Sequence, residues 1–187
     1  RARQAVCHHA EAVPQVALLF STAAHYRKIN GLFSRDNTRL SGALQALLEG
    51  QQSVEVLAEH HLAGRMAEYP LIVAPEWEYL EPEFKSDLVA YVKSGGNLLL
   101  IGPKTAALFP TELGVTLEDS PKPSGPIYLA HNGVLTVTKG EMQPVKLGPE
   151  AAPFGKLHQT DDVASTSQPA ASITKLGRGQ IAATYFT

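Results

Sequence analysis

The side chains best suited to chemistry follow three short apolar runs, each typical of a strand buried on both faces. The runs are residues 16–20, 71–74 and 98–101, and the side chains that follow them are His25, Tyr26, Arg35, Glu76, Trp77 and Lys104. Because ligands gather at the carboxyl ends of parallel strands, we expect these side chains to share one edge of a sheet. Aromatic rings beside carboxylate and guanidinium groups would suit contact with a carbohydrate or a partner protein.

Each of these candidates also has a purely structural interpretation. Trp77, the single tryptophan, would stack on a ligand or anchor an interface if exposed, or would fold back over the sheet edge as peripheral core. Glu76 and Glu78 have the types of a general acid and base, but alternate positions of an extended segment point in opposite directions, which favours solvated loop charges. Arg35 and Asp36 would more simply pair locally and cap the following helix.

No residue pattern predicts a metal ion or a cofactor. The pairs His8–His9 and His60–His61 are adjacent in sequence, and neither has the spacing of a zinc motif. Cys7 has no predicted helix start or basic neighbour that would activate its thiol. Gly177 and Gly179 resemble part of a dinucleotide-binding loop, but a strand follows them instead of a helix, so we predict a turn.

Strands and helices alternate through the first two-thirds of the chain. The clearest stretch, residues 69–103, reads as a buried strand, a loop, an amphipathic helix that begins near Pro82 and stops at Gly95–Gly96, and a second buried strand. Further elements are expected as a helix between Asn37 and Gly50, a strand at 54–57 and a short helix at 62–66. This alternation predicts an α/β fold, with an open parallel sheet covered on both faces.

The last third of the chain predicts antiparallel hairpins. Asn132-Gly133 and the Gly177–Gly179 turn each separate two apolar segments, which is the sequence pattern of a β-hairpin. The paired strands are expected at 127–130 with 134–138 and at 172–176 with 180–186, with a further strand at 142–147 and a surface loop at 161–171. We expect a connector at residues 1–15, then one α/β domain at 16–187 with a β-hairpin extension from about residue 118.

Composition excludes several classes of protein. The 187 residues are 44% hydrophobic and 18% charged, as in an ordinary globular domain, and the net charge of −2 gives no electrostatic footprint for nucleic acid. No apolar run approaches the roughly 20 residues that span a bilayer. Because the chain begins with Arg, we expect a segment of a longer polypeptide, in a compartment that the sequence does not define.

Three segments resemble the class I glutamine amidotransferase-like fold, a flavodoxin-like sheet. They are YPLIVAPEWEYLEPE, DLVAYVKSGGNLLLIGP and LGRGQIAATYF. The closer resemblance is to the non-catalytic version of this fold found in large glycoside hydrolases, such as the trimerisation domain of bacterial β-galactosidases. It covers about residues 16–115 and 172–187. The implied fold is a flavodoxin-like, mainly parallel sheet with helices on both faces, extended by the C-terminal hairpins.

The resemblance also locates a missing nucleophile. In active members of the family, a cysteine stands at the sharp turn after the strand that matches residues 98–101, where helix N–H groups lower its pKa. Here that position falls at Gly102, and the turn reads Gly102-Pro103-Lys104-Thr105. Thr105 lies too far into the turn, and Lys104 does not replace the nucleophile in this chemistry. We therefore expect no catalytic residue in this chain.

The resemblance implies a non-catalytic accessory or oligomerisation domain of a larger bacterial glycoside hydrolase. The expected partners are an upstream catalytic domain of the same chain, further copies in a homo-oligomer and carbohydrate; neither nucleic acid nor membrane is expected. The expected contact residues are His25, Tyr26, Arg35, Glu76 and Trp77. Two alternatives stay open: a divergent amidotransferase-like hydrolase with an unrecognised nucleophile, and a small-molecule-binding module.

Overall fold

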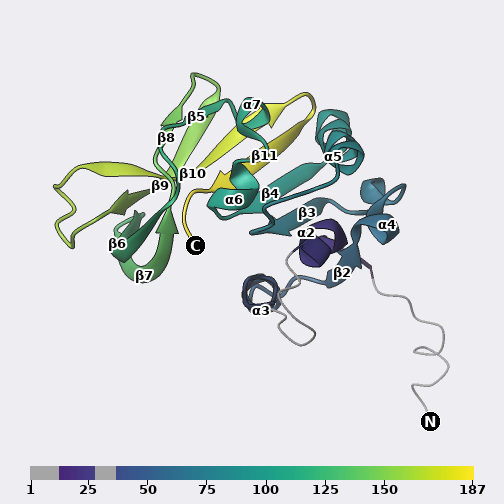
Figure 1. The fold of residues 1–187 in the computed structure, drawn as a ribbon, viewed down its shortest axis with the longest axis horizontal. Helices are drawn as coiled ribbons and strands as arrows, with labels where there is room; N and C mark the ends of the chain where they lie inside the picture. The colour runs from purple at the N-terminus through teal and green to yellow at the C-terminus, as the bar shows by residue number, and fades with distance from the viewer. Residues whose placement is uncertain (1–12, 28–36) are drawn as a thin grey trace, which may run out of the picture.

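A computed structural model describes residues 13–27 and 37–187 of the chain. Among these residues, nine strands form one sheet in the order β2-β1-β3-β4-β11-β10-β9-β6-β7, and two more, β5 and β8, form a small second sheet (Figure 1). The strands are β1 (Val16–Phe20), β2 (Val54–Ala58), β3 (Leu71–Pro75), β4 (Asn97–Ile101), β5 (Val115–Leu117), β6 (Lys122–His131), β7 (Val134–Met142), β8 (Val145–Leu147), β9 (Ala151–His158), β10 (Ser167–Leu176) and β11 (Gly179–Thr184).

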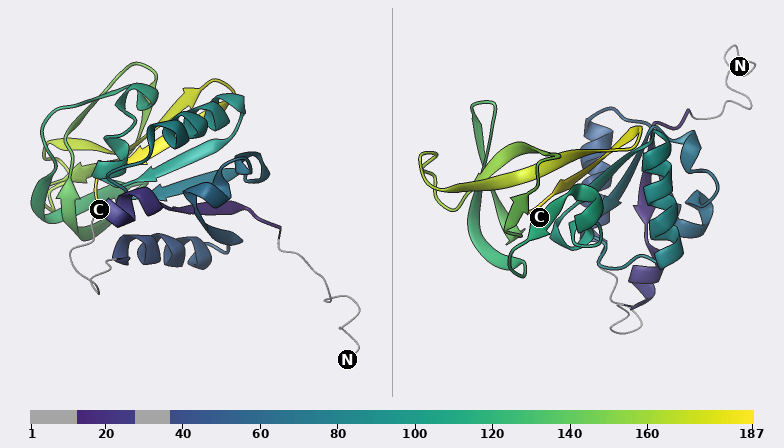
Figure 2. Two further views of the ribbon diagram at one scale, coloured as in Figure 1. Left: turned by 45° about the vertical axis from the view of Figure 1, so that its right-hand side comes forward. Right: turned by 90° about the horizontal axis from the view of Figure 1, so that it is seen from above.

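The helices lie in the amino-terminal two-thirds of the chain. They are α2 (Thr22–Arg27), α3 (Thr38–Glu49), α4 (Glu59–Leu62), the 3₁₀ turn η1 (Met66–Glu68), α5 (Pro82–Ser94), α6 (Pro103–Ala106) and α7 (Pro110–Leu113). α3 and α5 lie on opposite faces of the parallel strands, as Figure 2 shows. The predicted α/β class is therefore confirmed.

The expected βαβ unit forms as the sequence indicates. β3 and β4 pair in parallel, from Leu71 beside Asn97 to Pro75 beside Ile101. The stripe of α5 that faces the sheet is buried, and its members are Phe84, Leu88, Tyr91 and Val92. These side chains pack in the main core with residues of β1, β3, β4 and β11. On the other face, α3 covers a smaller core that includes Val16, Leu18 and Val73.

The second half of the sheet is antiparallel. β4 pairs in parallel with β11, after which β10, β9, β6 and β7 each pair in antiparallel fashion. The sheet is thus mixed, with as many antiparallel as parallel pairings, whereas the sequence predicted a mainly parallel one. Both predicted hairpins are present, because Asn132 and Gly133 adopt positive φ between β6 and β7, and Gly177 does so between β10 and β11.

Other local predictions were wrong. The short helix expected at 62–66 is absent as such, because Gly64, with φ of 79°, separates α4 from η1. The loop expected at 161–171 ends early, since β10 begins at Ser167 and pairs with β9, a strand that the sequence did not reveal. The segment after β1 begins with the helix α2, which the sequence did not predict.

Part of the sequence prediction lies outside the described residues. Residues 1–12 of the expected connector, with Cys7 and the His8–His9 pair, fall there, as do Arg35 and Asp36. Asn37 is the N-cap residue before α3, but its side chain makes no capping hydrogen bond. Among the helices that the structure describes, none has the length and apolar character needed to cross a membrane.

We predict that Gly96→Ala will destabilise the fold by about 2–3 kcal/mol, because a Cβ there would overlap the ring of Tyr91. That Cβ would lie 2.1 Å from Tyr91 Cζ, and the Tyr91 hydroxyl donates a buried 2.8 Å hydrogen bond to the carbonyl of Tyr69. Gly42→Ala in α3 is the control, since nothing lies within 4 Å of its Cβ. It should stabilise by about 0.5–1 kcal/mol. Urea unfolding measures both, and equal effects would contradict this packing.

Candidate functional site

The candidate site is the sharp turn between β4 and α6. Gly102 stands there with φ of 92°, a conformation that favours glycine. Its N–H donates to Thr184 Oγ1 at 2.8 Å, and its carbonyl accepts from the N–H of Ala106 at 3.1 Å. The structure therefore places Gly102 at a strand-to-helix elbow, as the sequence predicted.

The only side-chain hydroxyl in the Gly102–Thr105 turn forms a structural hydrogen bond. Thr105 is fully buried, and its hydroxyl donates to the carbonyl of Trp77 at 3.0 Å. This bond fixes the loop after β3 against α6. Thr105 is thus committed to a backbone contact and does not face an open site.

The carboxyl group of Glu76 fills the space above Gly102. A Cβ built on Gly102 would lie 1.4 Å from Glu76 Oε2. Glu76 has φ of 34°, and its N–H donates to the carbonyl of Ile101 at 2.7 Å, which ties the loop to the end of β4. Among the described residues, Oε2 is buried without a hydrogen-bond partner. A nucleophilic side chain at position 102 and the Glu76 carboxyl therefore exclude each other.

Burial raises the pKa of Glu76 to about 7. The ammonium group and backbone amide of Lys104, together with Arg39, oppose this increase, and Glu141 adds to it. Glu76 would thus exchange a proton near neutral pH, as a general acid or base does. Acid–base chemistry needs a reacting group beside it, and the turn offers no such nucleophile.

A row of aromatic side chains lies at the ends of β1 and β3. The Phe20 ring is 5.1 Å from that of His25 and 5.7 Å from that of Trp77, and His25 is 5.7 Å from Tyr26. Trp77 is half-buried, packs against the main core and donates its N–H to the carbonyl of Leu19 at 2.8 Å. It folds over the sheet edge, while Tyr26 remains exposed.

The structure thus brings together three of the five predicted contact residues. His25, Tyr26 and Trp77 belong to the aromatic row, Glu76 lies over Gly102, and Arg35 lies outside the described residues. Glu78 is exposed, in contrast to Glu76, so the two carboxylates do not form a matched buried pair. The described residues contain no group of three or more His, Cys, Asp or Glu side chains arranged for a metal.

Sequence reasoning missed a buried carboxylate at the same edge. Glu59 accepts hydrogen bonds from Ser21 Oγ at 2.8 Å, Thr22 Oγ1 at 2.9 Å and the N–H of Ala23 at 3.1 Å. It thereby holds the start of α2, a short helix without acidic residues of its own in the first turn. No local signal could have revealed this, because about 37 positions separate the partners. The three hydrogen bonds that the Glu59 carboxylate accepts indicate a structural role.

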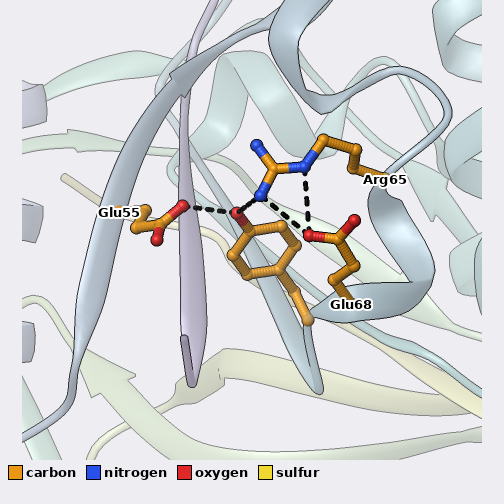
Figure 3. A network of polar contacts seen from close by, with 4 residues as sticks. Glu55, Arg65 and Glu68 are labelled. Carbon is orange, nitrogen blue, oxygen red and sulfur yellow. Dashed lines mark hydrogen bonds and ion pairs between the residues drawn. The ribbon is translucent and has the colours of Figure 1, made fainter. Parts of the chain in front are cut away.

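A second polar network lies at the opposite edge, where β2 and β3 begin (Figure 3). The hydroxyl of Tyr69 donates to Glu55 at 2.5 Å and accepts from Arg65 at 3.2 Å, and Arg65 also pairs with Glu68 at 2.7 Å. Burial, followed by the Glu55 carboxylate, raises the pKa of Tyr69 to about 12. Tyr69 therefore stays protonated as a donor, and the network ties β2 to the segment that contains η1.

Comparisons with solved structures identify the fold in larger proteins. A catalytic mutant of a GH42 β-galactosidase from G. stearothermophilus matches 95% of this chain with a TM-score of 0.77 at 17% identity. The α-L-fucosidase isoenzyme 2 from Paenibacillus thiaminolyticus matches 98% with 0.71 at 18%, and an exo-β-1,4-mannosidase from Opitutaceae bacterium strain TAV5 matches 93% with 0.67 at 16%.

The matched region is a small part of each of those enzymes. This chain spans 28% of the β-galactosidase and 31% of the fucosidase and the mannosidase. No protein-family model and no curated protein matches the sequence. The chain therefore shares its fold with one segment of several larger glycoside hydrolases.

We predict that Glu76 makes the fold less stable as the pH rises through 7. The native pKa lies above the ordinary value of 4.5, so the native state binds the proton more tightly. The protonated Glu76 side chain therefore contributes fully to the free energy of unfolding below pH 4.5, and this contribution is lost as the pH rises through about 7. Between pH 5 and 8, the free energy of unfolding of the wild type should fall by about 1–2 kcal/mol relative to that of Glu76→Gln. This value is reduced because the carboxyl is partly solvated.

Urea unfolding across this pH range measures the difference. Glu83→Gln, at an exposed position of α5, is the matched control and should follow the wild type. Parallel pH profiles for the wild type and Glu76→Gln would contradict the predicted protonation of Glu76.

Proposed function

We propose that this chain is a non-catalytic accessory domain of a larger bacterial glycoside hydrolase-like protein. The match of nearly the whole chain to under a third of several glycoside hydrolases carries the proposal. A domain of this size leaves most of such a protein for a separate catalytic domain. By analogy with the matched enzymes, the parent would act on galactosides or fucosides.

The closed elbow supports the absence of catalysis. Glu76 occupies the space of a nucleophile at position 102, and the Thr105 hydroxyl is bonded to a backbone carbonyl. We also assign the parallel half to the flavodoxin-like, amidotransferase-like type. The strand order β2-β1-β3-β4-β11 supports that assignment, because it is the order of a flavodoxin-like sheet.

A bare apolar sheet face supports a role in packing. Phe154 of β9 is paired with Ala171 of β10, and Ile173 of β10 with Ala182 of β11, so their side chains share a face. Ala182 is in turn paired with Leu99 of β4, which packs under α3. The core beneath α3 contains no described residue of β6 to β11. The extension thus continues this face without its helix, as Figure 2 shows.

Several large side chains are exposed on this surface. Phe154 is 48% and Ile173 37% exposed, and Val137, on the edge strand β7, is 58% exposed. Contiguous exposed apolar residues mark interaction sites. In the proposal, this face packs on the catalytic domain or on a neighbouring subunit. His25, Tyr26, Glu76 and Trp77, which follow β1 and β3, would contact a partner or a sugar, and the proposal assigns the same role to Arg35.

We predict that Phe154→Glu combined with Ile173→Glu will release this packing in the full-length protein encoded by the open reading frame. Placing two carboxylates in an apolar interface adds an uncompensated desolvation cost. We expect a smaller assembly in analytical ultracentrifugation, or, if the contact is within one chain, several-fold faster proteolysis between the domains. Asp87→Lys, on the exposed side of α5, is the charge-changing control and should leave both unchanged.

An unchanged assembly and proteolysis rate for the double variant would contradict the packing role. An open reading frame without a second domain, together with a monomeric product, would contradict it as well.

A second candidate function is a divergent hydrolase that uses Glu76. The observation that favours it is the pKa of about 7, which suits a general acid or base. The accessory-domain proposal predicts that the isolated chain does not hydrolyse glutamine, p-nitrophenyl esters or p-nitrophenyl glycosides above the buffer rate. Turnover that Glu76→Gln abolishes would establish the hydrolase instead.

A further inference from the structure

A hollow lies where β9 turns into β10. Figure 1 shows this turn at the end of the extension that is far from α5. The volume of the hollow is about 270 Å³. Met142 and Leu157, both almost fully buried, are its apolar lining residues. Gln168 stands beside Leu157, because the two residues are paired across β9 and β10. The hollow is separate from the turn at Gly102 and from the apolar face described above.

The polar lining of this hollow is uncharged. It consists of amides and hydroxyls: Gln159, Thr160, Ser165, Thr166 and Gln168. Such a lining offers hydrogen-bond donors and acceptors but no counter-charge, so it does not suit a phosphate, a carboxylate or a cation. Apolar side chains beside neutral hydrogen-bonding groups match a molecule with a C–H surface and several hydroxyls.

One acceptor of this lining lacks a partner. Gln168 Oε1 is buried and, among the described residues, accepts no hydrogen bond. A buried acceptor left unpaired costs about 1–3 kcal/mol, so such groups normally have a partner, whether protein, water or ligand. The partner that Oε1 requires is a donor, and a ligand hydroxyl would supply one.

The loop that bounds the hollow is organised by its own hydrogen bonds. The hydroxyl of Ser165 donates to the carbonyl of Asp162 at 2.5 Å and lies 3.3 Å from the hydroxyl of Thr160, which donates to it. Asp162 Oδ1 accepts from the N–H of Ala164 at 2.9 Å. Ser165 Oγ also lies 3.4 Å from Nδ1 of the buried His158. A loop arranged in advance lowers the entropy cost of binding.

We propose that this hollow binds a single uncharged sugar ring. Its volume is below the about 300–1,000 Å³ of pockets for drug-sized ligands, which limits the occupant to about one ring. The ring hydroxyls bond to the amides and hydroxyls, and one of them donates to Gln168 Oε1. The C–H surface of the ring lies on Met142 and Leu157. This binding is independent of the proposed packing role, because it uses neither the apolar face nor a second domain.

Amide NMR of the 187-residue chain tests the proposal, with D-glucose, D-galactose and D-mannose as probes. At least one of these sugars should give saturable shifts at residues 159–168, with a Kd of about 1–10 mM. Glycerol and inorganic phosphate are the ligand controls, and neither should saturate these residues. No saturable shift with any of the three sugars, or equal shifts with phosphate, would overturn the proposal.

Gln168→Leu separates binding from folding. The substitution removes the unpaired acceptor at similar size, so it should weaken sugar binding at least tenfold while leaving the urea midpoint unchanged or higher. Gln180→Leu, the same change at an exposed position of β11, should bind like the wild type. Thr166→Val provides a second variant if Gln168→Leu fails to fold. Undiminished binding by Gln168→Leu would assign Gln168 Oε1 to a water-filled structural gap and overturn the proposal. If only Thr166→Val folds, its undiminished binding would show that this lining does not hold the sugar, and would overturn the proposal as well.

Discussion

At the end of β4, the Glu76 carboxyl lies in the space that a side chain at Gly102 would need. The parallel half of the sheet and the hairpin extension meet at this point. Thr187 also reaches this point, since its Cγ2 would lie 3.1 Å from a Cβ on Gly102. The hydroxyl of Thr187 accepts a hydrogen bond from the N–H of Glu141 in β7, and the N–H of Thr187 donates one to the carbonyl of Glu141. The Thr187 carbonyl would lie 2.0 Å from a Cβ on Gly140. Two glycines thus allow the end of the chain to pass between the parallel strands and the hairpin extension.

This junction explains why the elbow is structural. A reactive side chain at position 102 would displace the Glu76 carboxyl and press on Thr187, so it would disturb the contacts of Thr187 with Gly140 and Glu141 of β7. The carboxyl is partly sheltered from water and remains protonated up to about neutral pH. The space beside Gly102 that a nucleophilic side chain would need is therefore occupied by the Glu76 carboxyl.

The parallel half was predictable because its signals are local. Residues 71–74 and 98–101 are apolar runs of strand length, the stripe from Phe84 to Val92 has helical period, and Gly95 with φ of 122° ends α5 where the glycine pair predicted. Asn132-Gly133 located the β6–β7 hairpin for the same reason. β9 was missed because Pro153 and Gly155 interrupt its pattern, and its pairing with β6 and β10 overrides propensity.

The site was less predictable than the fold. The sharp turn at Gly102 was predicted, but no local pattern indicates that Glu76, 26 positions earlier, lies over it. Glu76 and Glu78 were expected to point in opposite directions as solvated loop charges. The hydrogen bond from the indole N–H of Trp77 to the carbonyl of Leu19 likewise depends on tertiary packing between β1 and the loop after β3. The hollow beside Gln168 forms between β9 and β10, and one of those strands was not predicted.

A double-mutant cycle between positions 76 and 102 tests the central claim most directly. Gly102→Ala should destabilise the wild type by about 3 kcal/mol or more, through the overlap with the carboxyl and the strain at φ of 92°. In a Glu76→Ala background only the strain and the contact with Thr187 remain, so the cost should fall by about 1–2 kcal/mol. An equal cost of Gly102→Ala in both backgrounds would show that the carboxyl does not occupy this space and would contradict the account.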